Sequence, residues 1–184
     1  MKQYNPDIYH RHSIRLKGYD YSQEGLYFIT ICTQNHKHLF GEIKNVPHVG
    51  MVGVGSACPE SNINIPQMIL NPYGEIIQQC YWDLEHKYPN IECCEYVIMP
   101  NHFHAIIQID RDAFRAGEPR PYVVTLGHIV GYFKYQSTKM INLHGQKLWQ
   151  RNYYEHIIRD EKAYHNISNY ILNNPAQWAY DRLR

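Results

Sequence analysis

The sequence has no long apolar run. Its first residues, M-K-Q-Y-N-P-D-I-Y-H-R-H, contain no apolar segment that would serve as a signal peptide. No later stretch approaches the roughly 20 apolar residues that a membrane-spanning helix needs. We therefore expect no membrane association, and a reducing cytoplasm is the simplest compartment.

Cysteines at the spacings of known motifs are missing. The five cysteines are odd in number and contain no C-x-x-C pair, so the sequence predicts neither a disulfide framework nor a cysteine zinc site.

An excess of charge of one sign is also missing, because the net charge is only +1. Charge alone therefore does not indicate nucleic-acid binding, although a near-neutral total can hide a basic face.

The composition fits one globular domain. With 184 residues, of which 44% are hydrophobic, the chain is long enough to bury a core of its own, and we expect a single domain over residues 1–184. The polar segment 1–23 has no sustained period and is expected to be an extended arm. The segment at about 45–67 is rich in Gly and Pro and is expected to be an inserted loop.

Periodicity and turn residues predict an α+β fold. From apolar, β-branched and aromatic runs, we expect strands at 26–33, 39–43, 68–70, 91–100 and 102–110. From helical spacing and capping residues, we expect helices of about four turns from Pro72, at 123–141, and at 160–174 with Pro175 at its end. Strands and helices without parallel-sheet regularity predict a two-layer sandwich.

The most informative stretch is Y-V-I-M-P-N-H-F-H-A-I-I-Q-I-D, residues 96–110. The period of two in a strand puts His102 and His104 on one face, with Phe103 on the other. Two imidazoles on one face can share a metal ion and leave positions open for a third ligand, water and a substrate oxygen. Chance is the alternative, because the chain has 12 His and two surface histidines would give the same pattern.

The last predicted helix offers a nucleophile and a third ligand. Tyr170 and Asn174 stand four residues apart in I-S-N-Y-I-L-N-N-P and so share one helical face. Turned toward the histidine pair, this face would bring the phenol and the amide oxygen to one metal ion. Ordinary packing is the alternative for any one of 17 tyrosines, and Asn174 is alternatively a cap before Pro175. Competing candidates are Tyr153, Tyr154 and Tyr164 as nucleophile, and His156 and Glu155 as ligand.

Several motifs together resemble one family. They are M-P-N-H-F-H-A-I-I, W-Q-R-N-Y-Y-E-H-I-I-R-D-E, Y-I-L-N-N-P and, nearer the N-terminus, S-I-R-L-K-G-Y-D-Y and Y-F-I-T-I-C-T. With these motifs the chain resembles the REP-associated tyrosine transposases of the single-tyrosine HUH (IS200-like) superfamily, in which U is a hydrophobic residue. The resemblance runs nearly end to end and is interrupted at about 46–67 and 111–122.

The resemblance implies a fold and a reaction. The fold is an antiparallel sheet with helices on one face, ferredoxin-like or RRM-like in outline. The reaction is metal-dependent cleavage and rejoining of single-stranded DNA beside hairpin (REP) sequences, through a 5′-phosphotyrosine and a free 3′-hydroxyl. By position, Tyr170 is the nucleophile, His102 and His104 bind Mg²⁺ or Mn²⁺, and Asn174 helps to bind it. The resemblance leaves open a monomer or a homodimer.

Basic and aromatic residues are the candidates for DNA contact. Phosphate contacts need locally clustered cations, and unpaired bases stack on aromatic rings. Solvated helix faces and core packing are the alternatives, the latter especially for Tyr132 and Trp149. The candidates for phosphate contact are Arg11, Arg15, Lys17, Lys134, Lys139 and Arg151, and those for stacking are Tyr19, Tyr21, Tyr132 and Trp149.

Three other functions remain open from the sequence. A related HUH relaxase or replication initiator fits less well, because the chain has no long helicase-bearing extension. A DNA-binding module that keeps the sheet and has lost catalysis predicts binding without covalent attachment. A structural α+β protein with a fortuitous His-x-His predicts no bound metal.

Overall fold

The computed structural model describes residues 16, 18–48, 63–110 and 124–184. Predictions that fall on other residues, including the contacts of Arg11, Arg15 and Lys17, lie outside the described residues. In chain order the strands are β1 Gly25–Cys32, β2 Gly41–His48, β3 Ile63–Leu70, β4 Ile91–Met99, β5 His102–Ile109 and β6 Tyr154–Ile158. The helices are α1 Pro72–Lys87, α2 Leu126–Ile141 and α3 Glu161–Gln177, with short 3-10 turns at Gln34–His36 and Trp178–Tyr180.

Four of the strands form an antiparallel sheet in the order β4-β5-β1-β6. The long strands β1 and β5 lie at its centre, where continuous apolar runs are buried on both faces. Their register pairs Thr30 with His104 and Cys32 with His102. The predicted α+β fold with an antiparallel sheet is confirmed, and the end of β5 that carries the two histidines lies beside the end of β1.

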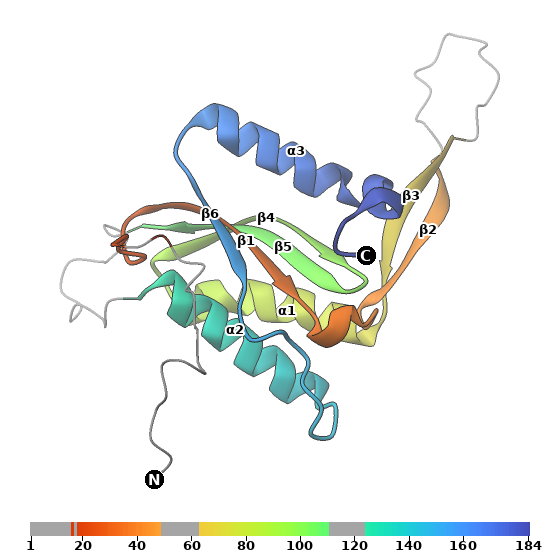
Figure 1. Ribbon diagram of the computed structural model, residues 1–184, viewed down its shortest axis with the longest axis horizontal. Helices are drawn as coiled ribbons and strands as arrows, with labels where there is room; N and C mark the ends of the chain where they lie inside the picture. The colour runs from red at the N-terminus through yellow and green to blue at the C-terminus, as the bar shows by residue number, and fades with distance from the viewer. Residues whose placement is uncertain (1–15, 17, 49–62, 111–123) are drawn as a thin grey trace, which may run out of the picture.

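The two faces of the sheet carry different layers. Figure 1 shows α1 and α2 below the sheet and α3 above it. Alternate residues such as Tyr27 and Phe103 face α1 and α2 and join the main core, whereas Phe28 and Ile106 face α3 and join a smaller cluster with Ile171. The helices α1 and α2 therefore form the layer that was expected on one face of the sheet. The helix α3 adds a third layer over the other face, which is the face that carries the histidines.

Capping residues explain where the helices begin. The side chain of Asn71 accepts hydrogen bonds from the backbone N–H groups of Tyr73 and Gly74, each at 3.0 Å, just before Pro72 starts α1. Asp160 accepts from the Ala163 N–H at 2.8 Å at the start of α3. The helices predicted from Pro72 and from Asp160 are therefore confirmed.

The segment predicted as an inserted loop is partly a β-ribbon. β2 and β3 pair along their whole lengths, so the expected pairing of 39–43 with 68–70 is confirmed and continues to His48 and Ile63. The loop boundaries of 45 and 67 were therefore wrong. Pro47 and Pro66 are tolerated in the ribbon because each strand of a two-stranded ribbon leaves one side without partners.

The helix α3 also runs further than predicted. It was expected to end at Pro175, yet it continues to Gln177 with Pro175 inside it. A proline near the C-terminal end removes only one helical hydrogen bond, and the chain turns into the 3-10 turn Trp178–Tyr180 shortly afterwards. Asn174 therefore lies within the helix and does not cap its end.

Candidate metal and nucleophile site

His102 and His104 begin the strand β5, and both side chains are buried on the face that α3 covers. The two residues are 0% and 2% exposed, and their ring centroids lie 4.6 Å apart. The alternation of the strand places them on one face, as predicted. This burial excludes the alternative that the pattern comes from two surface histidines.

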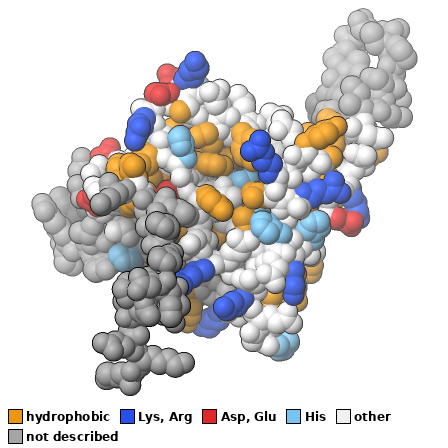
Figure 2. All heavy atoms as spheres, in the orientation of Figure 1, with side chains coloured by type: hydrophobic (Ala, Val, Ile, Leu, Met, Phe, Trp, Pro, Cys, Tyr) orange, Lys and Arg blue, Asp and Glu red, His pale blue; other side chains and the backbone are white. Residues whose placement is uncertain are grey.

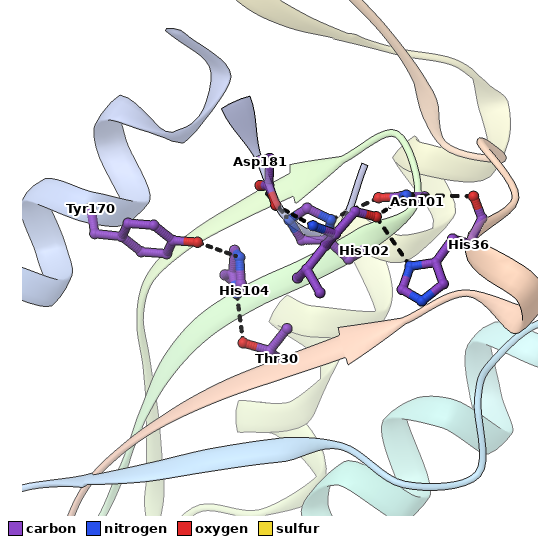
Figure 3. Close-up of polar contacts among 8 residues, drawn as sticks. Thr30, His36, Asn101, His102, His104, Tyr170 and Asp181 are labelled. Atoms are coloured by element: carbon purple, nitrogen blue, oxygen red, sulfur yellow. Dashed lines mark hydrogen bonds and ion pairs between the residues drawn. The ribbon is translucent and has the colours of Figure 1, made fainter. Parts of the chain in front are cut away.

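The hydrogen bonds of the His102 ring leave one nitrogen without a hydrogen-bond partner. Nδ1 lies 2.7 Å from Oδ1 of Asn101. Nε2 makes no hydrogen bond to any residue in the described part of the chain and lies 3.6 Å from Oδ2 of Asp181 (Figure 3). An unpartnered, buried imidazole nitrogen is an acceptor that a metal ion would satisfy.

The ring of His104 joins the sheet to the predicted nucleophile. Its Nδ1 lies 2.7 Å from Oγ1 of Thr30, the residue directly opposite on β1, and its Nε2 lies 3.3 Å from the hydroxyl oxygen of Tyr170 on α3. Phe28 stacks on the same imidazole at 5.3 Å between centroids. Thr30 and Phe28 therefore fix the ring on two sides, and Nε2 points at the phenol.

Burial keeps both imidazoles neutral. Desolvation lowers the pKa of His102 from 6.5 to about 4, against the opposing effect of Asp181. Desolvation also lowers the pKa of His104 well below its ordinary value, and the neighbouring His102 adds to the effect. Neutral imidazole is the form that binds a metal ion.

Acid is therefore expected to destabilise the metal-free protein. Between pH 6.5 and about 4 the unfolded chain protonates His102 while the folded chain does not, so the unfolded state binds more protons. The free energy of unfolding should fall as the pH falls, by up to about 1.4 kcal/mol per pH unit for each such histidine. Denaturant unfolding at pH 7, 5.5 and 4.5 measures this slope. The slope should become shallower in His104→Gln, which removes one of the two buried histidines, and should persist in the exposed His165→Gln. An unchanged slope in His104→Gln would contradict the idea that the burial of His104 causes part of the pH dependence.

Tyr170 reaches the histidines from the middle of α3. Its side chain packs edge-on against Phe28 and against His104, with centroids 6.2 Å and 5.3 Å apart, and 39% of the residue remains exposed. Burial raises the pKa of Tyr170, the charge of Asp181 adds to this, and the Asn174 side chain opposes it. The phenol is therefore protonated at neutral pH and must lose its proton during an attack.

Asn174 lies one turn further along α3, as the spacing predicted. It is 1% exposed, and its Oδ1 has no hydrogen-bond partner among the described residues. A buried amide oxygen without a partner is costly unless something outside the chain satisfies it. Oxygen ligands suit Mg²⁺ and Mn²⁺, so this atom and the Nε2 atom of His102 fit a divalent cation.

Asp181 is a component of the site that the sequence analysis missed. It follows the 3-10 turn after α3 and lies beside His102, 79 positions away in the sequence, with a side chain that is 7% exposed. Among residues 16, 18–48, 63–110 and 124–184, no group of three or more His, Cys, Asp or Glu is placed to hold a metal ion. The histidine pair therefore needs another kind of donor, such as Asn174, while Asp181 adds a negative charge that favours a cation nearby.

An open cleft of about 500 Å³ gives access to His104, Tyr170, Asn174 and Asp181, whereas the fully buried His102 is not among its lining residues. It lies between the face of the sheet that α3 covers and the C-terminal end of α3, and the exposed Tyr154 and Tyr180 are among its lining residues. Its lining residues are Phe28, Thr30, His104, Tyr154, Tyr170, Asn174, Gln177, Tyr180, Asp181, Arg182 and Leu183. The Tyr170 side chain lines this cleft and is 39% exposed, so it is accessible from outside.

The competing candidates occupy other positions. Tyr153 is buried in the main core, and the Tyr164 hydroxyl donates to Glu95 at 2.8 Å. Glu155 accepts a hydrogen bond from the Tyr21 hydroxyl at 2.7 Å, and its position in β6 faces away from α3. His156 lies on the same face as the site but is exposed. Of these competitors, only Tyr154 lines the cleft.

Of the predicted stacking residues, Trp149 is buried and the other three are half-buried. Trp149 is 6% exposed and donates from Nε1 to Ser137 Oγ at 2.9 Å, and Tyr132 packs edge-on against Tyr88. Tyr19 and Tyr21 pack together at 4.9 Å between centroids, on the α2 side of the sheet. All four rings take part in packing, and Tyr19, Tyr21 and Tyr132 remain partly exposed. Stacking of DNA bases on them stays a prediction.

The predicted phosphate-binding residues differ in their surroundings. The ammonium of Lys134 donates to the carbonyl oxygens of Gln150 and Asn152, each at 2.8 Å, so it holds the segment before β6 in place. Lys139 and Arg151 are exposed. Figure 2 shows Lys and Arg side chains scattered over both the upper and the lower half of the face drawn there. The DNA contacts of all three residues stay predictions.

Known proteins resemble this chain over most of its length. No protein-family model matches it. It is 40% identical to an uncharacterized protein of Haemophilus influenzae, over 98% of this chain and 97% of that protein. It is 24% identical to another protein of that organism, named "Putative REP-associated tyrosine transposase", over 88% of this chain and 76% of that protein. A solved REP-associated tyrosine transposase bound to a REP hairpin has a similar fold, with a TM-score of 0.58, 17% identity, and coverage of 92% of this chain and 77% of that one.

Among the described residues, none of the helices has the length and apolar character that crossing a membrane requires.

Proposed function

The chain belongs to the same family as its 40% identical Haemophilus influenzae relative and resembles the REP-associated tyrosine transposases in sequence and fold, and from this premise we propose that it cleaves and rejoins single-stranded DNA. The substrate class is DNA beside a hairpin, and the intermediate is a covalent phosphotyrosine. The observation that carries the proposal is the 3.3 Å contact between the Tyr170 hydroxyl and Nε2 of His104. In this contact the phenol meets His104, and both residues line the open cleft.

His102, His104 and Asn174 are proposed to hold a divalent cation, Mg²⁺ or Mn²⁺. Support comes from two buried acceptors, Nε2 of His102 and Oδ1 of Asn174, that have no hydrogen-bond partner among the described residues. When bound, the cation would polarise the scissile phosphate and stabilise the charge that develops on it. Asp181 adds a negative charge beside the site that favours cation binding.

The phenol oxygen of Tyr170 attacks phosphorus in the proposed reaction. A bond forms between this oxygen and the phosphorus as the phenol loses its proton, the bond from phosphorus to the 3′ oxygen breaks, and the 3′ oxygen takes up a proton and leaves as a hydroxyl group. The DNA fragment on the 3′ side of the break stays attached to the tyrosine through its 5′-phosphate, and the other fragment ends in the free 3′-hydroxyl. Attack by a 3′-hydroxyl on the phosphotyrosine reverses these changes, so rejoining consumes no nucleotide cofactor.

Adjoining hollows suggest a path for the DNA strand. The cleft at Tyr170 shares Thr30 and Tyr154 with a second hollow, and that hollow shares Gln150 with a third one. The third hollow is lined by Lys139 and Lys147 beside the exposed Tyr135. A strand that follows the segment before β6 would therefore pass from basic side chains to the nucleophile.

Charge reversal in the third hollow is expected to weaken DNA binding. Lys139→Glu combined with Lys147→Glu should lower the affinity for a single-stranded hairpin oligonucleotide by at least about tenfold at low salt, with a shallower dependence on salt, because fewer counterions are released. Fluorescence anisotropy at several salt concentrations measures both quantities. Lys162→Glu, on the exposed side of α3, is the matched control. Equal affinities in the double variant and the control would exclude this path.

The function is tested with a labelled single-stranded oligonucleotide that carries a hairpin from the flanks of the protein's own gene. Wild-type protein with Mg²⁺ or Mn²⁺ should give a protein-DNA adduct on a denaturing gel, and addition of EDTA should prevent it. Hairpin binding without any adduct would instead favour a DNA-binding module that has lost catalysis. If the protein neither binds the hairpin nor forms an adduct, the proposed function is refuted.

A further inference from the structure

We infer that Asn101 is a positioning residue for the metal site, because its side-chain amide fixes the proton of the His102 ring on Nδ1 and leaves Nε2 free to bind. The inference rests on the metal-binding role proposed for His102. Asn101 is the turn residue between β4 and β5, it is 0% exposed, and it lies directly before the histidine pair. Figure 3 shows its side chain between His102 and His36.

Two backbone carbonyl groups set the orientation of the Asn101 amide. Its Nδ2 donates to the carbonyl oxygen of Leu183 at 2.6 Å and lies 3.4 Å from that of His36. Carbonyl oxygens only accept hydrogen bonds, so the NH₂ group must face them. A flipped amide would set its own oxygen against both carbonyl oxygens. Oδ1 therefore faces the ring of His102.

The orientation of the amide decides which imidazole nitrogen carries the proton. Oδ1 of Asn101 lies 2.7 Å from Nδ1 of His102 and can only accept, so Nδ1 is the protonated nitrogen. A neutral imidazole has one N–H, and Nε2 is then left with its lone pair. Hydrogen bonds of this kind fix the tautomer of metal-binding histidines and tune their affinity.

A competitor makes the role of Asn101 necessary. Oδ2 of Asp181 lies 3.6 Å from Nε2 of His102, and a carboxylate at this distance favours the opposite tautomer, with the proton on Nε2. That tautomer would have no lone pair on the metal side. Because His102 is fully buried, water does not compete with these two partners. The hydrogen bond to Asn101 therefore keeps the proton of His102 on Nδ1 and leaves the lone pair of Nε2 available to a metal ion.

The backbone around Asn101 is firmly held. Its carbonyl oxygen accepts from the Thr33 N–H at 2.9 Å, and the carbonyl oxygen of Pro100 accepts from the Leu39 and Phe40 N–H groups at 2.7 Å and 3.1 Å. The amide thus belongs to a turn anchored on two segments of the core. Its contact with Leu183 also makes the orientation depend on the last residues of the chain, which fold back onto the site.

The test measures the tautomer and the metal affinity separately. Metal-free protein labelled with ¹⁵N in histidine gives a long-range ¹H–¹⁵N spectrum in which protonated and unprotonated ring nitrogens differ, and His102→Gln identifies the signals of His102. Calorimetric titration with Mn²⁺ gives the affinity. Wild type should show a protonated Nδ1. Asn101→Leu, of similar size, should lose this tautomer and bind Mn²⁺ about 10–100-fold more weakly.

Asn101→Asp is the conservative variant, because it keeps an acceptor beside Nδ1 while it loses the donor to Leu183. It should retain the wild-type tautomer and most of the Mn²⁺ affinity, with a lower melting temperature. If Asn101→Leu does not fold, this variant and the wild-type spectrum still decide. A wild-type His102 protonated on Nε2 would overturn the inference.

The remaining outcomes separate the inference from the proposed function. Wild-type Mn²⁺ binding with an unchanged affinity and spectrum in folded Asn101→Leu overturns the positioning role alone. A wild-type protein with a protonated Nδ1 that takes up no Mn²⁺ overturns the metal site and its positioning together. Loss of tautomer and affinity in Asn101→Leu, with both retained in Asn101→Asp, supports the inference.

Discussion

Tyr170→Phe is expected to abolish the protein-DNA adduct, with a fall of at least about a thousandfold in the rate of covalent attachment. The substitution removes the oxygen that attacks phosphorus, and loss of a nucleophile costs most of the rate of a covalent mechanism. The phenylalanine ring keeps the packing against Phe28 and His104. The hydroxyl loses its contact with His104 and its hydrogen bond with the Asn174 side chain, so stability should change by no more than about 2 kcal/mol. Hairpin binding should persist.

Two other tyrosines of the same cleft provide matched controls. Tyr154 and Tyr180 are 58% and 89% exposed and line the cleft with Tyr170. Tyr154→Phe and Tyr180→Phe should still form the adduct on a denaturing gel. An adduct that persists in Tyr170→Phe and disappears in Tyr154→Phe would move the nucleophile to β6 and refute the assignment made here.

His102→Ala is expected to lower the Mn²⁺ affinity by at least about 100-fold and to remove the adduct as well. Loss of a ligand should exceed the 10–100-fold cost of losing a residue that only orients one. The variant also leaves Oδ1 of Asn101 without its partner inside the protein, which costs about 1–3 kcal/mol of stability. His104→Ala should act in the same direction, since Nε2 of His104 faces Tyr170.

Calorimetry with Mn²⁺ and the adduct assay check this prediction on the same samples. His156→Ala is the control, because His156 is an exposed histidine on the same face of the sheet. Denaturant unfolding of the metal-free variants separates a loss of ligand from a loss of folding. Full Mn²⁺ affinity in a folded His102→Ala protein would place the metal elsewhere, and adduct formation without any divalent cation would make the metal unnecessary.

Some features of the site follow from local geometry, so the sequence was enough to predict them. The period of two in a strand puts His102 and His104 on one face, and the helical period puts Tyr170 and Asn174 on one side of α3. Capping by Asn71 and Asp160 set the start of two helices. Motif resemblance pointed to the REP-associated tyrosine transposases, and the sequence and fold comparisons confirm that resemblance.

Other features depend on long-range packing and could not be predicted. Nothing local indicates that α3 crosses the second face of the sheet, because that position follows from the burial of Ile171 against Ile106. The helix also continues past Pro175, because a proline there removes one hydrogen bond and leaves the rest of the helix intact. Asn174 consequently changes from a possible cap to a buried group at the site.

The C-terminal part of the site is the clearest case of a tertiary decision. Asp181 and Leu183 carry no motif, yet the turn after α3 brings a carboxylate within 3.6 Å of His102 and a carbonyl oxygen within 2.6 Å of the Asn101 amide. The sequence by itself determined which residue types share a face, because that depends on backbone periods. The tertiary structure alone decided which of them meet, which are buried, and which imidazole nitrogen remains free, because burial and hydrogen-bond partners come from residues far apart in the chain.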